Sequence, residues 1–146
     1  MSSVNDGLKL TGKLSIALNG RVVQEIDNLV TTAGKGYVAN RMRSDVSGGV
    51  ALMSHMAVGA GTNNPAAGDT ALQTESGRVA LTSSAVSAAV VTYIATFPAG
   101  TATAALTEAG ILNASSGGTL LCRTEFSVVN KGSSDAMTIT WTITVS

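Results

Sequence analysis

The side chains of this chain that could do chemistry are few and widely spaced. His55 is the only histidine and Cys122 the only cysteine. A hydrolytic triad would need the histidine beside a nucleophile and an orienting carboxylate, and a metal site would need companion ligands. No HExxH, GxSxG or CxxC pattern occurs in the sequence. We therefore expect His55 to be structural or on the surface, and Cys122, at an inward position of a strand, to be inert packing.

Three carboxylates, Asp69, Glu75 and Glu108, lie close to expected turns. They could bind a cation if loops bring them together, but capping or surface pairing explains each one more simply. Gly59-Ala60-Gly61 resembles part of a phosphate loop, yet no Lys-Ser or Lys-Thr follows and no strand–helix unit surrounds it. We expect turn glycines here. The sequence thus predicts no catalytic residue, no cofactor, no metal site and no enzymatic activity.

The balance of charge argues against a phosphate-binding surface. Nine basic and nine acidic residues cancel, and only 12% of the chain is charged, whereas affinity for nucleic acid depends on clustered Lys and Arg. Arg21, Lys35, Arg41 and Arg43 could form a modest basic patch, but a solvated face is the simpler interpretation. Aromatic residues make up 3% of the chain, so a sugar-binding platform is weakly supported. A weakly charged surface fits a subunit that packs against neighbours.

The sequence also bears on the compartment. One cysteine excludes an intrachain disulfide and a cysteine metal cluster. The first residues lack a basic and an apolar signal region. No apolar run approaches the ~18 residues of a membrane span. We expect folding in a reducing cytoplasm, without a membrane partner.

The element that must organise the fold is the stretch Met137–Val145. Large apolar residues alternate with threonine throughout it, and side chains on a strand alternate between the two faces of a sheet. On a helix, at about 100° per residue, the apolar residues would be spread around the axis and not gathered on one face. We predict a central strand with the only tryptophan, Trp141, at its middle and with an apolar face that the other elements cover.

The remaining pattern indicates further short strands. Asn19-Gly20 is a strong hairpin signal, and a strict two-residue turn would place Leu14 opposite Glu25, so we expect a longer loop or a bulge that aligns Leu14 with Ile26. The predicted strands are 8–18, 21–26, 53–58, 76–82, 86–97, 107–113, 120–128 and 137–145, with Leu120, Cys122, Phe126 and Val128 inward and Arg123, Glu125 and Ser127 outward.

Helical signals are weak and local. Thr31-Thr32 can cap a short helix over roughly 33–43, which Gly34 and Gly36 weaken. Asp69 can cap one helical turn over residues 69–72. Residues 86–97 carry large side chains at both parities, so we expect that strand to be covered on both faces, the second by another subunit.

These elements predict an all-β fold: an antiparallel β-sandwich, jelly-roll-like, with one short helix. We expect a flexible N-terminal arm over residues 1–7 and a single β-sandwich domain over residues 8–146.

Two segments resemble a known group of proteins. The first is His55-Met56-Ala57-Val58-Gly59-Ala60-Gly61-Thr62, followed by Pro65, Asp69-Thr70-Ala71-Leu72 and Glu75; the second is Thr107-Glu108-Ala109-Gly110-Ile111-Leu112-Asn113, followed by Gly117-Gly118-Thr119-Leu120-Leu121. Both resemble stretches that recur in small structural proteins of tailed bacteriophages, including tail-collar and tail-fibre proteins. The likeness covers roughly residues 53–145. It consists of strand-and-turn signatures that are specific for the virion group but not for a position in the virion.

The resemblance implies a virion structural protein with no catalytic residues to carry over. The chain has no shaft, coiled coil or repeats, so a capsid decoration (cement) protein fits better than a fibre. It would bind the major capsid protein on the outside of the phage head, assemble as a homo-oligomer (dimer or trimer) and form in the cytoplasm of the host bacterium. We expect contacts at residues 1–7, at residues 86–97 and at the loops around Asn63 and Thr101. A tail-fibre, tail-collar or baseplate component involved in host attachment is the alternative. A small hydrolase or metal-dependent enzyme is the reading from a different class.

Overall fold

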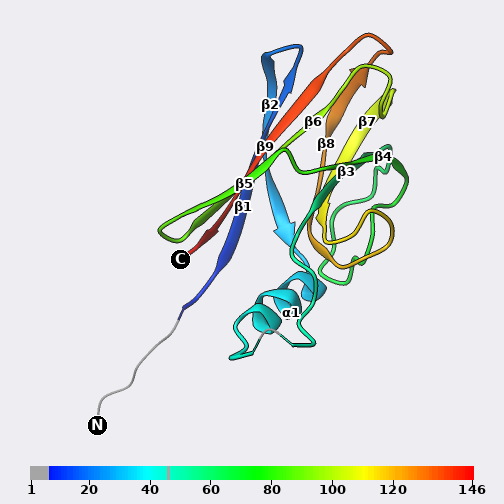
Figure 1. The fold of residues 1–146 in the computed structure, drawn as a ribbon. Helices are drawn as coiled ribbons and strands as arrows, with labels where there is room; N and C mark the ends of the chain where they lie inside the picture. Colours follow the sequence, from blue (N-terminus) through cyan, green and yellow to red (C-terminus); the bar gives the residue numbers. More distant parts are fainter. Residues whose placement is uncertain (1–6, 46) are drawn as a thin grey trace.

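A computed structural model describes residues 7–45 and 47–146, which fold into antiparallel strands and one helix. One sheet contains all nine strands, in the order β4-β3-β7-β8-β2-β1-β9-β6-β5 (Figure 1). The elements are β1 (Leu10–Leu18), β2 (Arg21–Val30), α1 (Thr32–Arg41), β3 (His55–Gly59), β4 (Glu75–Ala80), β5 (Ser83–Ser87), β6 (Val90–Phe97), β7 (Ala104–Leu112), β8 (Leu120–Lys131) and β9 (Met137–Val145).

Strand β2 connects the two layers of the fold. Along most of its length it pairs with β1, and only its last two residues, Leu29 and Val30, pair with Arg123 and Cys122 of β8. The sheet therefore curls at this point. Strands β2, β1, β9, β6 and β5 form one layer and β8, β7, β3 and β4 the other (Figure 1). The all-β, sandwich-like architecture predicted from the strand spacing is confirmed.

Strand β9 lies at the centre of the first layer, between β1 and β6. Its apolar residues Met137, Ile139, Trp141 and Ile143 are buried in the core. The indole Nε1 of Trp141 donates a hydrogen bond to Asn28 Oδ1 at 2.7 Å, which satisfies the polar atom of this buried ring. The predicted central strand is confirmed.

The β1–β2 hairpin has both predicted features. Asn19 and Gly20 adopt φ values of 50° and 81°, as a tight hairpin turn requires. A bulge shifts the register next to Ile16 and aligns Leu14 with Ile26. Ile26 can therefore pack against the core, while the strand keeps its two-residue turn.

The helix α1 is capped by Thr31, as predicted. The Thr31 hydroxyl accepts a hydrogen bond from the backbone N–H of Gly34 at 2.9 Å and donates one to the carbonyl of Leu120 at 2.7 Å. This side chain therefore ends β2, starts the helix and attaches both to β8. The helix ends at Arg41, slightly before the predicted boundary.

The prediction of one strand over residues 86–97 is wrong. This region is a hairpin, in which β5 and β6 are joined at Ala88 and Ala89. Ala88 takes a positive φ of 51°, a conformation that alanine rarely adopts and that its sequence therefore did not signal. Strand β5 is exposed along its whole length, so the described part of the chain itself covers neither of its faces. Coverage by another subunit stays a prediction.

Two smaller predictions are also wrong. Residues 69–72 form no helical turn; Asp69 instead closes a turn in which its N–H donates to the carbonyl of Ala66. Val128 points outward and is 53% exposed, because the register of β8 against β7 shifts between Leu106 and Glu108, so that Val129 takes the buried position. Residues 1–6 of the predicted arm lie outside the described residues.

Candidate functional site

The side chain of Glu108 on β7 is fully buried and organises the loop between β3 and β4. Its Oε2 accepts hydrogen bonds from the backbone N–H groups of Gly61 at 2.8 Å and Thr74 at 2.7 Å. Its Oε1 accepts from the N–H of Gln73 at 2.8 Å and from Arg123 Nε at 3.0 Å. One carboxylate therefore holds both ends of the segment 60–74, which we call the pinned loop.

Arg123 on β8 completes the arrangement and is only 1% exposed. Its Nη2 lies 2.9 Å from Glu108 Oε1, and its Nη1 lies 3.1 Å from Asp69 Oδ2. Nη2 also donates to the side-chain oxygen of Asn63 at 2.8 Å. We call Glu108, Arg123 and Asp69 the Glu108 centre. Arg123 thus holds the middle of the pinned loop, at Asn63 and Asp69, and Glu108 holds its two ends.

The glycines of the Gly59-Ala60-Gly61 motif are required by this close packing. A Cβ on Gly59 would overlap the backbone carbonyl of Thr74, and one on Gly61 would overlap the Glu108 carboxylate. The hydroxyl of Thr107 donates to the carbonyl of Gly61 at 2.6 Å. The motif therefore has a structural purpose. Gly61 lies in the loop after β3, as predicted for a turn glycine, whereas Gly59 is the last residue of β3 itself.

A small second core lies beneath the pinned loop. Leu72 from the loop packs with Ala57, Leu112 and Leu120, on the face of the sheet that is turned away from the main core. Gly110 makes room for it, because a Cβ there would press against the side chains of Leu120 and Leu72. Strands β3, β7 and β8 are therefore covered on both faces, by the main core and by the loop.

A second arginine holds the neighbouring turn. Arg78 on β4 pairs with Glu75 at 2.7 Å. Its Nη1 donates to the carbonyls of Ala114 at 2.8 Å and Gly117 at 2.9 Å. Of the three carboxylates singled out in the sequence, the structure thus brings Asp69 and Glu108 to one arginine and leaves Glu75 with another.

The Glu108 centre is suited to holding structure and not to moving protons. Burial would raise the pKa of Glu108, but the hydrogen bonds from Thr74, Gln73, Arg123 and Gly61 outweigh it and lower the pKa below its usual value. The group is therefore an ionised acceptor whose oxygens are already occupied. It offers no proton and no free lone pair to a substrate.

The remaining reactive side chains do not converge on a site. His55 is part-exposed, and its Nδ1 lies 2.7 Å from the hydroxyl of its neighbour Ser54. Cys122 is fully buried in the main core, where burial raises the pKa of its thiol well above the usual value. A thiol that stays protonated is a poor nucleophile. Within residues 7–45 and 47–146, no group of three or more His, Cys, Asp or Glu side chains could hold a metal ion.

The four basic residues considered as a patch do not form one. Arg21 begins β2 at the hairpin turn, whereas Lys35 and Arg41 belong to the helix that follows the other end of this ten-residue strand. Arg41 donates to the carbonyl of Val50, and Arg43 pairs with Asp45 at 2.6 Å. The interpretation as a solvated face is supported.

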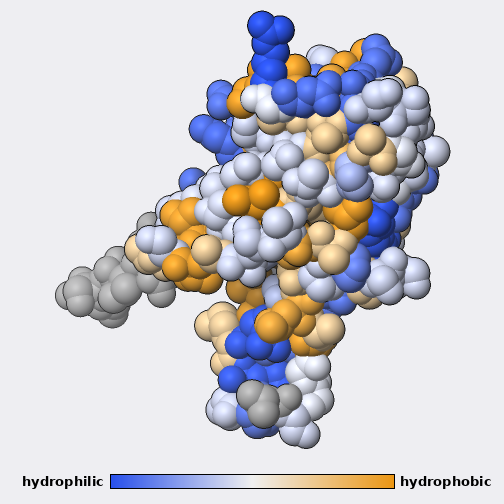
Figure 2. All heavy atoms as spheres, turned by 45° about the horizontal axis from the view of Figure 1, so that its top comes forward, coloured by the Kyte–Doolittle hydropathy of each residue, from blue (hydrophilic) through white to orange (hydrophobic). Residues whose placement is uncertain are grey.

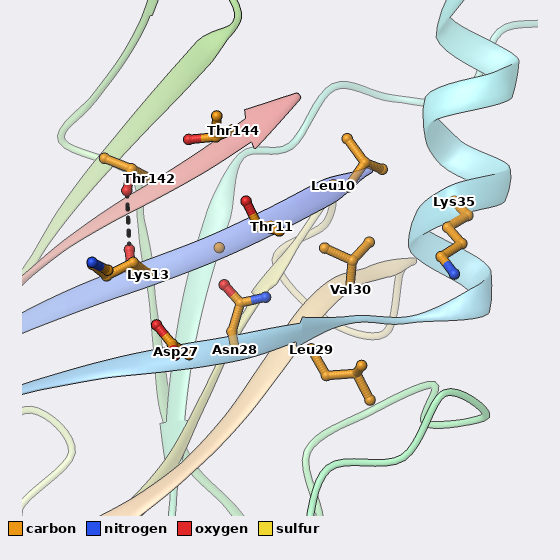
Figure 3. Close-up of a pocket in the computed structure, with 11 residues that line it drawn as sticks. Leu10, Thr11, Lys13, Asp27, Asn28, Leu29, Val30, Lys35, Thr142 and Thr144 are labelled. Atoms are coloured by element: carbon orange, nitrogen blue, oxygen red, sulfur yellow. Dashed lines mark hydrogen bonds between the residues drawn. The ribbon is translucent and has the colours of Figure 1, made fainter. Parts of the chain in front are cut away.

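Two hollows adjoin the junction between the first layer and the helix. The larger, about 610 Å³, lies around Gly12 and Asn28, with Lys13, Asp27 and Lys35 at its rim (Figure 3). The second, about 480 Å³, is lined mainly by apolar residues of the chain before β1 and of α1, Leu8, Leu10, Val38 and Met42 among them. Neither contains a histidine, a cysteine or a pair of facing carboxylates.

Large apolar side chains also reach the surface at separate places. Figure 2 shows them as several groups among weakly polar residues on the face in view. The most exposed among the described residues are Leu8, Val22, Leu52, Val86, Val128 and Met42. Apolar residues scattered over the surface in this way are common on folded proteins and do not mark a ligand site.

No helix in the described part of the chain is long and apolar enough to cross a membrane. Comparison of the chain with protein-family models, with curated proteins and with solved structures finds no match.

The sequence reasoning missed the two residues that complete the site. The alternation predicts that Arg123 points outward, and the loop around Asn63 is predicted only as a contact region. One signal could have revealed Arg123: it is a charged residue within a strand. In the structure Cys122, Arg123 and Thr124 are all buried, because both faces of this strand are covered. Strict alternation assumes that one face is open to water, and here it is not.

Proposed function

We propose that this chain is a structural protein of a tailed bacteriophage virion, and specifically a capsid decoration protein. It would bind the major capsid protein on the outside of the head as a homo-oligomer and stabilise the shell. It would be made in the cytoplasm of the host and act by burying surface across neighbouring subunits, without catalysis.

One observation carries the proposal. The two segments that resemble phage structural proteins, 55–75 and 107–121, are the segments that meet around Glu108. The residues of these two segments fix a loop against a sheet. The two resembling segments therefore form one structural unit. The most buried charges of the chain, Glu108 and Arg123, hold the shape of an exposed loop. We take this use of buried charge as support for a binding role.

The pinned loop gives such a protein a rigid contact surface. Thr62, Asn63 and Asn64 are exposed, yet their backbone is held in place. The N–H groups of Thr62 and Asn63 donate to the side-chain oxygen of Gln73, and Arg123 donates to the carbonyl of Asn63. A preformed loop loses little conformational entropy when it binds. The loop around Asn63, expected from sequence to be a contact region, is therefore the first candidate for the surface that faces the shell.

The test is reconstitution on particles that lack the protein. Phage heads from a strain with the gene deleted are mixed with the purified chain, sedimented and imaged by cryo-electron microscopy. We expect saturable binding in a fixed ratio to the major capsid protein, with density over the head. Density confined to the tail would favour the alternative, a tail-fibre, tail-collar or baseplate component involved in host attachment. No binding to any part of the particle would contradict both.

A further inference from the structure

In the part of the chain that the structure describes, β5 is a free sheet edge without the usual protection against pairing. It is the last strand of the sheet, and each of its residues, Ser83 to Ser87, is exposed. No charged residue occurs between Arg78 and Glu108, so the whole β5–β6 hairpin is uncharged. Natural proteins usually protect such edges with charges, proline or a bulge, because alternate residues direct unpaired N–H and C=O groups outward.

The opposite edge of the sheet is protected. Strand β4 carries Glu75 and Arg78, which form an ion pair. Arg78 also ties the turn at Ala114 and Gly117 to this edge. The difference between the two edges indicates that β5 is left open for a partner strand.

An apolar row leads from the core to this open edge. Ile143 of β9 is opposite Val91 of β6, which is opposite Val86 of β5. Residues directly opposite each other share a face, so all three lie on the core side of the layer. Ile143 is 5% exposed, whereas Val86, at the end of the row, is 71% exposed. The apolar row therefore ends at Val86 with a side chain that no other part of the described chain covers.

We propose that two copies of this chain pair through β5 in antiparallel orientation, with Val86 opposite Val86 of the second copy. The symmetric pairing continues the apolar row across the junction and covers both valines. It also places Ala85 opposite Ser87, so that small, uncharged side chains meet and no like charges face each other.

The neighbouring structure leaves room for this pairing. The hairpin tip lies beside the C-terminal strand, where Val145 N–H donates to the carbonyl of Ala89 (Figure 1). That contact holds the hairpin in place on its β9 side and leaves its β5 side open. Because a single strand pair buries less surface than a standard interface, we expect a reversible, concentration-dependent dimer.

The test joins cross-linking to sedimentation. Val86→Cys should form a disulfide-linked dimer on mild oxidation, because directly opposite residues of an antiparallel pair have Cα atoms about 4.5–5.5 Å apart. Ser87→Cys is the matched control on the same exposed strand; its sulfur would face Ala85 and should cross-link at least tenfold less. Cys122 is buried and should not react.

The second variant is Val86→Lys, which puts a charge at the centre of the pairing. In sedimentation velocity we expect the wild-type dimer to dissociate to monomer in this variant. Val22→Lys, at another exposed valine, should sediment like wild type. Equal cross-linking of both cysteine variants, or a sedimentation profile that Val86→Lys leaves unchanged, would overturn the inference. The inference concerns the free chain, so it does not depend on the proposed place in a virion.

Discussion

Glu108 and Arg123 show what two buried charges can do when all their hydrogen bonds are satisfied. Removing a charged group from water costs several kcal/mol, and only good geometry repays it. Here the carboxylate receives three backbone N–H groups and a guanidinium, and the guanidinium reaches a second carboxylate and an amide. The consequence of burying Glu108 and Arg123 is that the pinned loop has one defined conformation.

We predict that Glu108→Gln lowers the free energy of unfolding at neutral pH by about 3 kcal/mol. The amide loses the charge that balances Arg123, and its NH₂ group must face a backbone N–H. Chemical denaturation measures the change. Glu125→Gln is the control, because Glu125 lies directly opposite Glu108 on β8 but is part-exposed. Equal midpoints for the two variants would show that the centre is unimportant for stability.

The same residue makes stability depend on pH. The pKa of Glu108 is lowered on folding, so the unfolded chain binds its proton more readily than the folded chain does. Its contribution is complete above the unfolded pKa, about 4.3, and is lost as the pH falls through the folded pKa. The difference in stability between wild type and Glu108→Gln should therefore shrink in acid. The pKa of Asp135 is also lowered, but both proteins share that effect. A constant difference down to pH 2 would contradict this assignment.

At the scale of elements, the turns decided how well the sequence could be interpreted. Asn19-Gly20 favours positive φ at both residues, so the β1–β2 hairpin and its bulge were predictable. Ala88-Ala89 carries no such signal, so the sequence pattern predicts one strand where the structure has two, β5 and β6. The pinned loop was hidden for another reason: its course depends on residues of β7 and β8 that are distant in the sequence.

The helix offers a matched test of packing against propensity. A Cβ on Gly34 would overlap the backbone carbonyl of Leu121, whereas nothing lies within 4 Å of one on Gly36. We expect Gly34→Ala to destabilise the protein by about 3 kcal/mol, because backbone cannot move aside as a side chain can. Gly36→Ala should stabilise it by about 0.5–1 kcal/mol through helix propensity. Thermal melts measure both, and a loss of stability in Gly36→Ala would show that an unseen contact governs that position.

At the scale of the whole molecule, β2 makes the two layers interdependent. Its first part belongs to the β1 side and its end to β8, and the buried residues of both layers form one core. The sequence predicted this all-β fold because alternation marked most strands. It did not reveal which strands are neighbours, since β1 and β9 pair across almost the whole length of the chain.

We predict that both layers unfold in one cooperative transition. Trp141 is the only tryptophan and lies buried in the first layer, so its fluorescence reports on that layer. Proteolysis at the pinned loop reports on the second. The two midpoints in denaturant should coincide. Separate midpoints would mean that the layers are independent units.

The pairing of the first strand with the last sets how the protein responds to mechanical load. Lys9 and Ser146 exchange two backbone hydrogen bonds, and the first residue of β1 pairs with the last residue of β9. Tension applied between these two points acts along the hydrogen bonds and opens the β1–β9 ladder one pair at a time, beginning at the loaded end, where Leu10 pairs with Val145. Load that enters through the faces and loops of the sheet instead does not pull on this pair of residues, so the ladder between β1 and β9 is not opened from its end.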